Sequence, residues 1–284
     1  MATLGVHTFA FAPTWQPQQI SAVAPSLRDH GVTVLEIPLL RPDEIDVAAS
    51  VRLAREYDFT LVCSLGLPAS LDIMRSPDEA LAFLEPAFKV TQALGSGILS
   101  GVTYTTIGRT TGRAPTQEEK DSVCHFLESA ARLAGRFNLQ LGIEPCNRYE
   151  THLMNTAQQA VDYIERLSAG NVVIHLDTYH MHIEERDFGS AFATASPFLG
   201  YVHVSESNRG TPGQGMVDWS AVMQGLAAIS YSGTLTLESM NHVDVDIAGA
   251  LAIWRPVADN PDEVISVGLP FLKDVAGRSG LVLR

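Results

Sequence analysis

Four short apolar runs decide the fold of this chain: LQLGIEP (residues 139–145), VVIHLDT (172–178), LGYVHVSES (199–207) and TLTLES (234–239). Their Val, Ile and Leu content is typical of parallel strands that are buried on both faces. Each run carries a potential ligand near its end, and these four residues are Glu144, Asp177, His203 and Glu238. Intervals of 33, 26 and 35 residues separate them, which leaves room for a helical crossover between successive strands.

Similar apolar runs occur four times earlier, at residues 4–11, 34–39, 61–67 and 97–104. Eight strands separated by helical patterns predict an α/β fold, a (β/α)8 TIM barrel, with residues 1–284 as a single domain. The chain has no linker or low-complexity tract that would mark a second domain. The alternative is an open doubly wound sheet, and the absence of a GxGxxG motif after the first run weakens it.

Three of the intervening segments show the clearest helical patterns. Residues 116–137 carry apolar side chains at three-to-four spacing, after a polar and acidic start. A second helix begins at Thr156, which has capping-box spacing to Gln159. A third begins after Asp218, turns Trp219, Val222, Leu226 and Ile229 inward, and stops near residues 231–233.

The composition excludes some classes of function. A formal net charge of -13 argues against binding to a phosphate backbone, so we expect no nucleic acid partner. No run of about 18 apolar residues occurs and no basic stretch precedes the apolar N-terminus, so we expect neither membrane insertion nor export. Cys63, Cys124 and Cys146 lack CxxC spacing, which fits a reducing cytoplasm and, for Cys63 and Cys124, a buried apolar role.

The four residues at the strand ends predict a metal site. The C-terminal ends of barrel strands converge at one rim, where three carboxylates would repel one another unless a cation held them. Each residue alone has an ordinary reading, a surface glutamate or a hydrogen-bonded core histidine. Oxygen and imidazole ligands without thiolate favour a six-coordinate divalent metal, Mn2+ first, with Co2+ or Mg2+ as alternatives, and disfavour structural zinc. Two open coordination positions would accept two adjacent oxygens of a sugar.

Three further polar residues follow these strands, and we expect them in loops at the same rim. They are Glu150, His180 and Arg209, whose side chains would bind the hydroxyls and carbonyl of a small polyol. The alternative readings are a surface acid, a capping histidine and a solvated cation. The glycine-rich RGTPGQG segment (209–215) lacks the GK[ST] of a phosphate-binding loop, so we expect a turn that shapes the rim.

Several motifs of the chain resemble those of a known family. The strings are EPCNRYE (144–150), LDTYHMHIEE (176–185), YVHVSESNRGTPGQG (201–215), LTLES (235–239) and AIWR (252–255). Together and in this order they resemble the ketose 3-epimerases, which include D-tagatose, D-allulose (psicose) and L-ribulose 3-epimerase, in the xylose-isomerase-like TIM barrel superfamily. The likeness extends over nearly the whole chain and is densest from residue 140 to 256.

The resemblance implies an isomerase that inverts C3 of a free ketose through a cis-enediolate. Glu144 and Glu238 would be the two acid/base residues, and both would bind Mn2+ or Co2+ together with Asp177 and His203. Glu150, His180 and Arg209 would contact the substrate near its O1 and O2 atoms. Together with the four metal ligands, they form the expected site of seven residues. The likeness also implies a homodimer or a homotetramer.

Some positions depart from the family pattern and bear on recognition of C4 to C6. The segment 103–116 lacks the tryptophan-bearing loop of the tagatose-type enzymes, Met240 replaces a frequent aromatic, and His7 occupies a variable position. The main alternative function is a hydroxypyruvate-isomerase-like or other sugar isomerase. Two further alternatives are a phosphorylated ketose as substrate and an endonuclease of the same superfamily, and the scarcity of positive charge disfavours both. A sugar-binding protein without catalytic activity is another alternative, which the presence of both glutamates disfavours.

Overall fold

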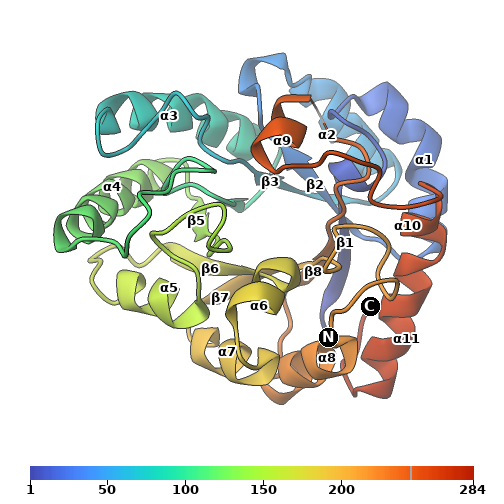
Figure 1. Ribbon diagram of the computed structural model, residues 1–284. Coiled ribbons are helices and arrows are strands. Elements are labelled where there is room, and N and C mark those ends of the chain that lie inside the picture. Colours follow the sequence, from blue (N-terminus) through green and yellow to red (C-terminus); the bar gives the residue numbers. More distant parts are fainter. Residues whose placement is uncertain (244) are drawn as a thin grey trace.

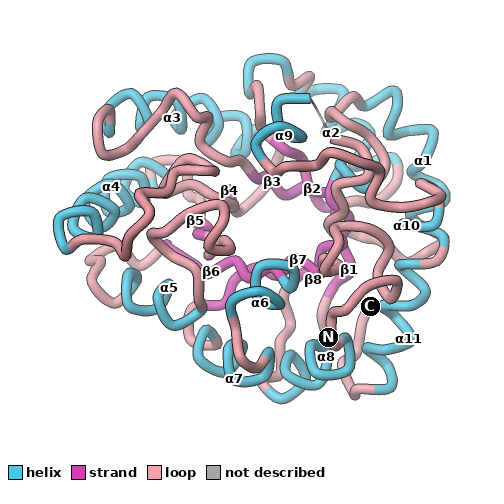
Figure 2. Tube along the Cα trace, in the orientation of Figure 1, coloured by secondary structure: helices cyan, strands magenta, loops and turns pink. Residues whose placement is uncertain are grey.

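The computed structural model of the protein describes residues 1–243 and 245–284. Eight parallel strands pair in chain order, and β8 pairs with β1 to close a barrel, as predicted (Figures 1 and 2). The strands are β1 (Thr3–His7), β2 (Val34–Pro38), β3 (Thr60–Ser64), β4 (Ile98–Ser100), β5 (Gln140–Ile143), β6 (Val172–Asp177), β7 (Leu199–Val204) and β8 (Thr234–Leu237).

Helices form the outer ring around the strands (Figure 2). The larger ones are α1 (Pro17–Asp29), α2 (Val47–Glu56), α3 (Pro77–Ala93), α4 (Gln117–Gly135), α5 (Ala157–Ile164), α7 (Phe188–Ala195), α8 (Trp219–Ala228) and α11 (Gly268–Arg278). Shorter ones are α6 (Thr178–Glu184), α9 (Val245–Ala250) and α10 (Glu263–Ser266), with 3-10 turns η1 (Thr8–Ala10) and η2 (Pro42–Glu44). In Figure 1, α6 and α9 lie over the open end of the barrel.

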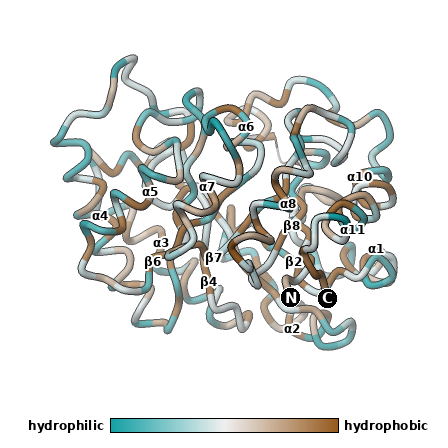
Figure 3. The backbone as a smooth tube through the Cα atoms, turned by 90° about the horizontal axis from the view of Figure 1, so that it is seen from below, coloured by the Kyte–Doolittle hydropathy of each residue, from teal (hydrophilic) through white to brown (hydrophobic). Residues whose placement is uncertain are grey.

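Burial explains why the strand sequences are nearly continuous apolar runs. All five residues of β2 and four of five in β3 are buried between the barrel interior and the helices. Along the chain, apolar segments lie inside and hydrophilic ones outside (Figure 3). Cys63 and Cys124 are buried free thiols, as expected.

Strand register brings the predicted ligands to one end of the barrel. Asp177 is the last residue of β6 and is aligned with His203 of β7. Glu144 directly follows β5, and Glu238 directly follows β8. All four therefore lie at the C-terminal ends of adjacent strands, where barrel enzymes carry their chemistry.

The capping-box prediction for α5 is confirmed. The Thr156 hydroxyl accepts from the Gln159 N–H, and the Gln159 side chain accepts from the Thr156 N–H. An equivalent box between Thr116 and Glu119 starts α4. These caps fix where each helix leaves the preceding loop.

Several predicted segments were too long; the run 61–67, for example, forms a strand only to Ser64, and the run 199–207 only to Val204. The first strand ends at His7, whose Nδ1 accepts from the Phe9 N–H and begins a 3-10 turn. The run 97–104 forms a strand only to Ser100, because Gly101 turns the backbone to a φ of 106°. The helix after Asp218 ends at Ala228, so Ile229 is a cap residue and is only partly buried.

Among the described residues, we find no helix that combines the length and the apolar character needed to cross a membrane.

Candidate active site

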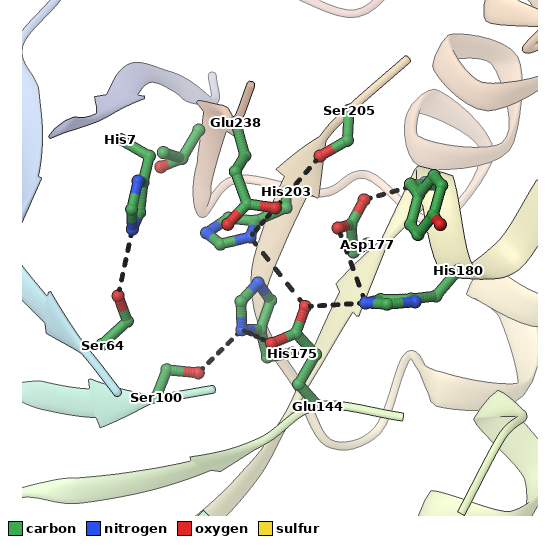
Figure 4. Close-up of polar contacts among 12 residues, drawn as sticks. His7, Ser64, Ser100, Glu144, His175, Asp177, His180, His203, Ser205 and Glu238 are labelled. Carbon is green, nitrogen blue, oxygen red and sulfur yellow. Dashed lines mark hydrogen bonds and ion pairs between the residues drawn. The ribbon is translucent and has the colours of Figure 1, made fainter. Parts of the chain in front are cut away.

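The four predicted ligands lie in one buried cluster at the mouth of the barrel (Figure 4). Glu144 and Glu238 are each 7% exposed, Asp177 is fully buried and His203 is 2% exposed. Ligand atoms of Asp177, His203 and Glu238 all lie within 4.8 Å of one another. Glu144 joins the cluster with Asp177 and His180 on one side and with His175 and His203 on the other.

Arg209 lies among these acids. Its Nη1 donates to Asp177 Oδ2 at 2.9 Å and to Glu238 Oε2 at 2.6 Å. Its guanidinium carbon lies 3.8 Å from the centre of the Tyr179 ring, a distance suited to a cation–π contact. The residue has a φ of 62°, a left-handed conformation that is uncommon outside glycine. The arginine that was predicted to face a sugar is thus held against the acidic cluster by its backbone and by Tyr179.

His180 lies in helix α6 and not in a loop, which corrects the prediction. Asp177 accepts from the Tyr179 N–H and caps this helix, so the ligand strand passes directly into α6. The backbone N–H of Asn147 donates to His180 Nδ1 at 3.1 Å. A neutral His180 therefore carries its proton on Nε2, which lies 3.8 Å from Glu144 Oε1 and can donate into the site.

Glu150 lies in the loop after β5, as predicted, and faces the same space. Its Oε1 accepts from Asn147 Nδ2 at 2.8 Å and lies 3.9 Å from Arg209 Nη2. Asn147 thus holds both Glu150 and His180 in place. The structure brings all three predicted substrate-binding residues beside the four predicted ligands.

A second polar group, which was not predicted from the sequence, lies beneath this cluster. Glu36 of β2 and His175 of β6 are fully buried. His175 Nδ1 and Ser100 Oγ lie 3.0 Å apart, and His175 Nδ1 lies 3.8 Å from Glu144 Oε2 (Figure 4). Glu36 Oε2 lies 2.8 Å from His203 Nε2. Both residues carry the signal that identified the other acids, a charged or polar residue inside an apolar strand.

Burial and charge act differently on the two glutamates. Burial raises the pKa of Glu144 well above its usual value, and the acids Glu238 and Asp177 raise it further against His203 and Arg209. Burial also favours a raised pKa for Glu238, but His203 and Arg209 outweigh it and hold that pKa well below the usual value. Burial raises the pKa of Asp177 to about 6. A site with one carboxyl that holds its proton and one carboxyl that ionises easily is suited to proton transfer.

The donor set fits a divalent metal ion. His203 Nδ1 is fully buried and makes no hydrogen bond, although it lies 3.5 Å from Glu238 Oε2 and 4.0 Å from Glu144 Oε1. A buried nitrogen without a hydrogen-bond partner is costly unless its lone pair is used. Three carboxylates and this imidazole are ligands for a hard or borderline ion.

The site opens through two joined cavities. The inner one, of about 80 Å³, is bordered by Glu144, His203 and Glu238, with His7 and Met240 farther along its wall. The outer one, of about 560 Å³, is bordered by Tyr149, Tyr179 and Trp254. Glu150, Arg209 and Leu251 line both. A small polar molecule can therefore enter past Glu150 and Arg209.

Known proteins are similar to this chain along nearly its full length. L-ribulose 3-epimerase from Methylomonas sp. (strain DH-1) is 33% identical over 275 residues, covering 95% of this chain and 96% of that protein. A ketose 3-epimerase from Arthrobacter globiformis is 31% identical and covers 95% and 96%. The crystal structure of D-allulose 3-epimerase from Methylomonas sp. in complex with D-allulose superposes with a TM-score of 0.89 at 31% identity, covering 96% of each chain.

The sequence profile of the family described as xylose isomerase-like TIM barrel matches residues 1–275. The fold, the full-length similarity and the motifs agree. The chain therefore belongs to the xylose isomerase-like TIM barrel family and, within it, to the ketose 3-epimerases.

Proposed function

We propose that this protein is a metal-dependent epimerase that inverts C3 of a free ketose. Its full-length similarity to named ketose 3-epimerases supports the reaction class. Metal dependence is supported by one observation, the buried cluster of Glu144, Asp177, His203 and Glu238, in which Nδ1 of His203 has no hydrogen-bond partner. Mn2+ is the metal we expect first, with Co2+ or Mg2+ as alternatives.

In this proposal, Glu144 and Glu238 are the acid/base pair. When bound, the divalent ion would polarise the ketose carbonyl and make the proton on C3 more acidic. One glutamate removes that proton, which leaves a cis-enediolate. The other glutamate returns a proton to C3 from the opposite face, and the centre is inverted. Because both groups are carboxyls, either one can act first, and the reaction runs in both directions.

Three residues would orient the sugar near O1 and O2. Arg209 supplies a positive charge, and His180 supplies an Nε2–H donor for the developing oxyanion. Glu150 would accept from a substrate hydroxyl. Their mutual contacts through Asn147 and Tyr179 support this role, because preformed donors need no reorganisation when the charge develops.

Product analysis tests this proposal. The Mn2+-loaded protein is incubated separately with D-fructose, D-allulose, D-tagatose and L-ribulose, and the sugars are separated by chromatography. At least one ketose is expected to yield its C3 epimer, and chelator treatment is expected to abolish turnover. Formation of an aldose without any C3 epimer would favour the alternative, a hydroxypyruvate-isomerase-like or other sugar isomerase.

We also propose a homodimer or a homotetramer located in the cytoplasm. The oligomer follows from the likeness to the family, and the compartment from the unpaired cysteines. Light scattering of the purified protein measures the first. Fractionation of the source cells measures the second.

A further inference from the structure

Glu36 is a buried carboxylate that the reaction itself does not require. It lies in the middle of β2 and is fully buried inside the barrel. Its Oε2 accepts from His203 Nε2 at 2.8 Å and from the Tyr201 hydroxyl at 2.7 Å. Its Oε1 makes no hydrogen bond and lies 3.7 Å from His7 Nε2. Burying such a charge is costly unless a specific partner needs it.

The contact with Glu36 determines which nitrogen of His203 carries a proton. A carboxylate can only accept, so the short contact requires a proton on His203 Nε2. In the neutral ring, the lone pair then belongs to Nδ1. That nitrogen faces Glu144 and Glu238 and has no hydrogen-bond partner. Glu36 therefore holds the imidazole in the tautomer, and in the orientation, in which Nδ1 can bind a metal.

We propose that Glu36 is a positioning residue that sets the metal affinity of the site through His203. The inference rests on the proposed metal-dependent function, but it concerns a residue that touches neither the cavity wall nor the acid/base pair. A carboxylate behind a ligating histidine makes the imidazole a stronger donor and reduces its freedom to turn. Removing such a partner typically weakens metal binding by about 10- to 100-fold.

Tyr201 allows a matched control. Its hydroxyl contacts the same Oε2 of Glu36 and also lies 2.5 Å from Thr236 Oγ1, so it belongs to the same buried network. Its ring also packs edge-on to the His203 ring, with the ring centroids 5.6 Å apart, and Tyr201→Phe keeps this ring while it removes the hydroxyl. If Glu36 served only to satisfy buried donors, Tyr201→Phe and Glu36→Gln would disturb the protein in similar ways. If Glu36 positions His203, only Glu36→Gln should weaken metal binding strongly.

The experiment measures Mn2+ affinity directly, by competition with a fluorescent chelator, for the full-length wild type, Glu36→Gln and Tyr201→Phe. Circular dichroism and thermal unfolding verify that each variant is folded. Glu36→Gln is expected to raise the Mn2+ dissociation constant about 10- to 100-fold, and Tyr201→Phe by less than about threefold. The visible spectrum of the Co2+-loaded protein should shift for Glu36→Gln and stay unchanged for Tyr201→Phe.

Two outcomes would overturn the inference. One is a folded Glu36→Gln variant with the Mn2+ affinity and Co2+ spectrum of the wild type, and the other is an equal loss of affinity in both variants. If Glu36→Gln does not fold, Glu36→Asp replaces it, because it keeps the charge but withdraws the oxygens by about 1.5 Å. Unchanged affinity in that variant contradicts the inference equally. A wild-type protein that binds no Mn2+, Co2+ or Mg2+ would instead overturn the proposed function.

Discussion

Glu144 and Glu238 have the same side chain but different surroundings. Burial raises the pKa of Glu144, and the neighbouring acids Glu238 and Asp177 raise it further. Glu238 contacts both Arg209 and His203 and is easily ionised. This difference arises from the strands on which the residues lie, because Arg209 follows β7, next to β8 and away from β5.

The proposed acid/base pair predicts severe effects of isosteric substitution. Glu144→Gln and Glu238→Gln should each lower kcat by about 10²- to 10⁴-fold, the usual contribution of a general acid or base. Steady-state epimerisation kinetics with saturating metal measure this effect. Glu185→Gln is the control, because Glu185 accepts from the Ala157 N–H outside the cavities and should retain activity. Near-native turnover in either active-site variant would rule out the two-glutamate scheme.

We expect a substitution of Arg209 to raise KM for the ketose, and so to act on substrate binding. Arg209→Lys keeps the charge but loses the planar group that contacts Tyr179 and the acids, so KM should rise by about tenfold. Arg148→Lys is the matched control, because Arg148 is an exposed arginine paired with Glu184. Kinetics with the best ketose measure both. An unchanged KM in Arg209→Lys would remove Arg209 from substrate binding.

At the scale of single elements, the short strand β4 depends on Gly101. Its φ of 106° is unfavourable for other residues, and an added Cβ would lie 2.4 Å from the Leu65 carbonyl oxygen. The Gly101 carbonyl also accepts from the Glu144 N–H, so displacement here would move a proposed ligand. The end of β4 and the acid/base site are therefore connected through one backbone hydrogen bond.

Gly101→Ala should thus destabilise the protein by more than about 2 kcal/mol, since both strain and a backbone clash apply. Gly112→Ala is the comparison, because Gly112 also has a positive φ, 71°, but no atom lies within 4 Å of the added Cβ. Its cost should be about 1 kcal/mol. Denaturant unfolding of both variants measures the difference. Equal free energies of unfolding for the two variants would contradict the expected clash between the added Cβ of Gly101→Ala and the Leu65 carbonyl.

The capping box of helix α4 should make the free energy of unfolding depend on pH. The Thr116 N–H donates to Glu119 and lowers the pKa of this carboxyl to about 2, with a further contribution from His152. Because the folded-state pKa lies below the unfolded value, the stabilisation is present above about pH 4.5 and is lost as the pH falls towards 2. Glu119→Gln should therefore lose about 1 kcal/mol at pH 7 and lose less at pH 3. Urea unfolding at both pH values measures this, and a constant difference would contradict it.

The sequence predicted most of the strands, and the clustering of the four proposed ligands at one rim, because both follow from a local pattern, an apolar run that ends on a charged or polar residue. It could not predict the end of β4, which depends on the close approach of Gly101 to Leu65, the residue that directly follows β3. The helical position of His180 was missed because the capping residue of α6 is Asp177, already assigned as a ligand. Glu36 was missed because it lies in the middle of its apolar run and not at the end, and its partners Tyr201 and His203 are 165 and 167 residues away.

At the scale of the whole molecule, negative charge dominates the interior as well as the surface. The formal net charge is -13. Among the described residues, five acids are buried with one arginine, and the acids are Glu36, Glu144, Asp177, Glu206 and Glu238. Glu206 is satisfied by four donors, which are the N–H groups of Ser207, Gly213 and Val217 and the Trp219 indole. The other four surround His203, where a cation would relieve their repulsion.

Metal binding should therefore stabilise the folded protein. At a free Mn2+ concentration of 100 times the dissociation constant, the free energy of unfolding should rise by about 2.7 kcal/mol. Thermal unfolding with added Mn2+ and with a chelator measures this as a concentration-dependent Tm. A Tm that is the same under both conditions would argue against a metal site in the folded state.

Exchange of hydrogen between the solvent and one sugar carbon distinguishes inversion at C3 from the other possible reactions. The Mn2+-loaded protein is incubated with D-allulose, and with any ketose that proves a better substrate, in D2O, and the recovered sugars are examined by NMR. We expect deuterium at C3 of the product epimer, because one carboxyl removes a proton and the second carboxyl delivers another. Deuterium at C1 or C2 alone, or an inverted C3 that retains its original hydrogen without any solvent label, would contradict it.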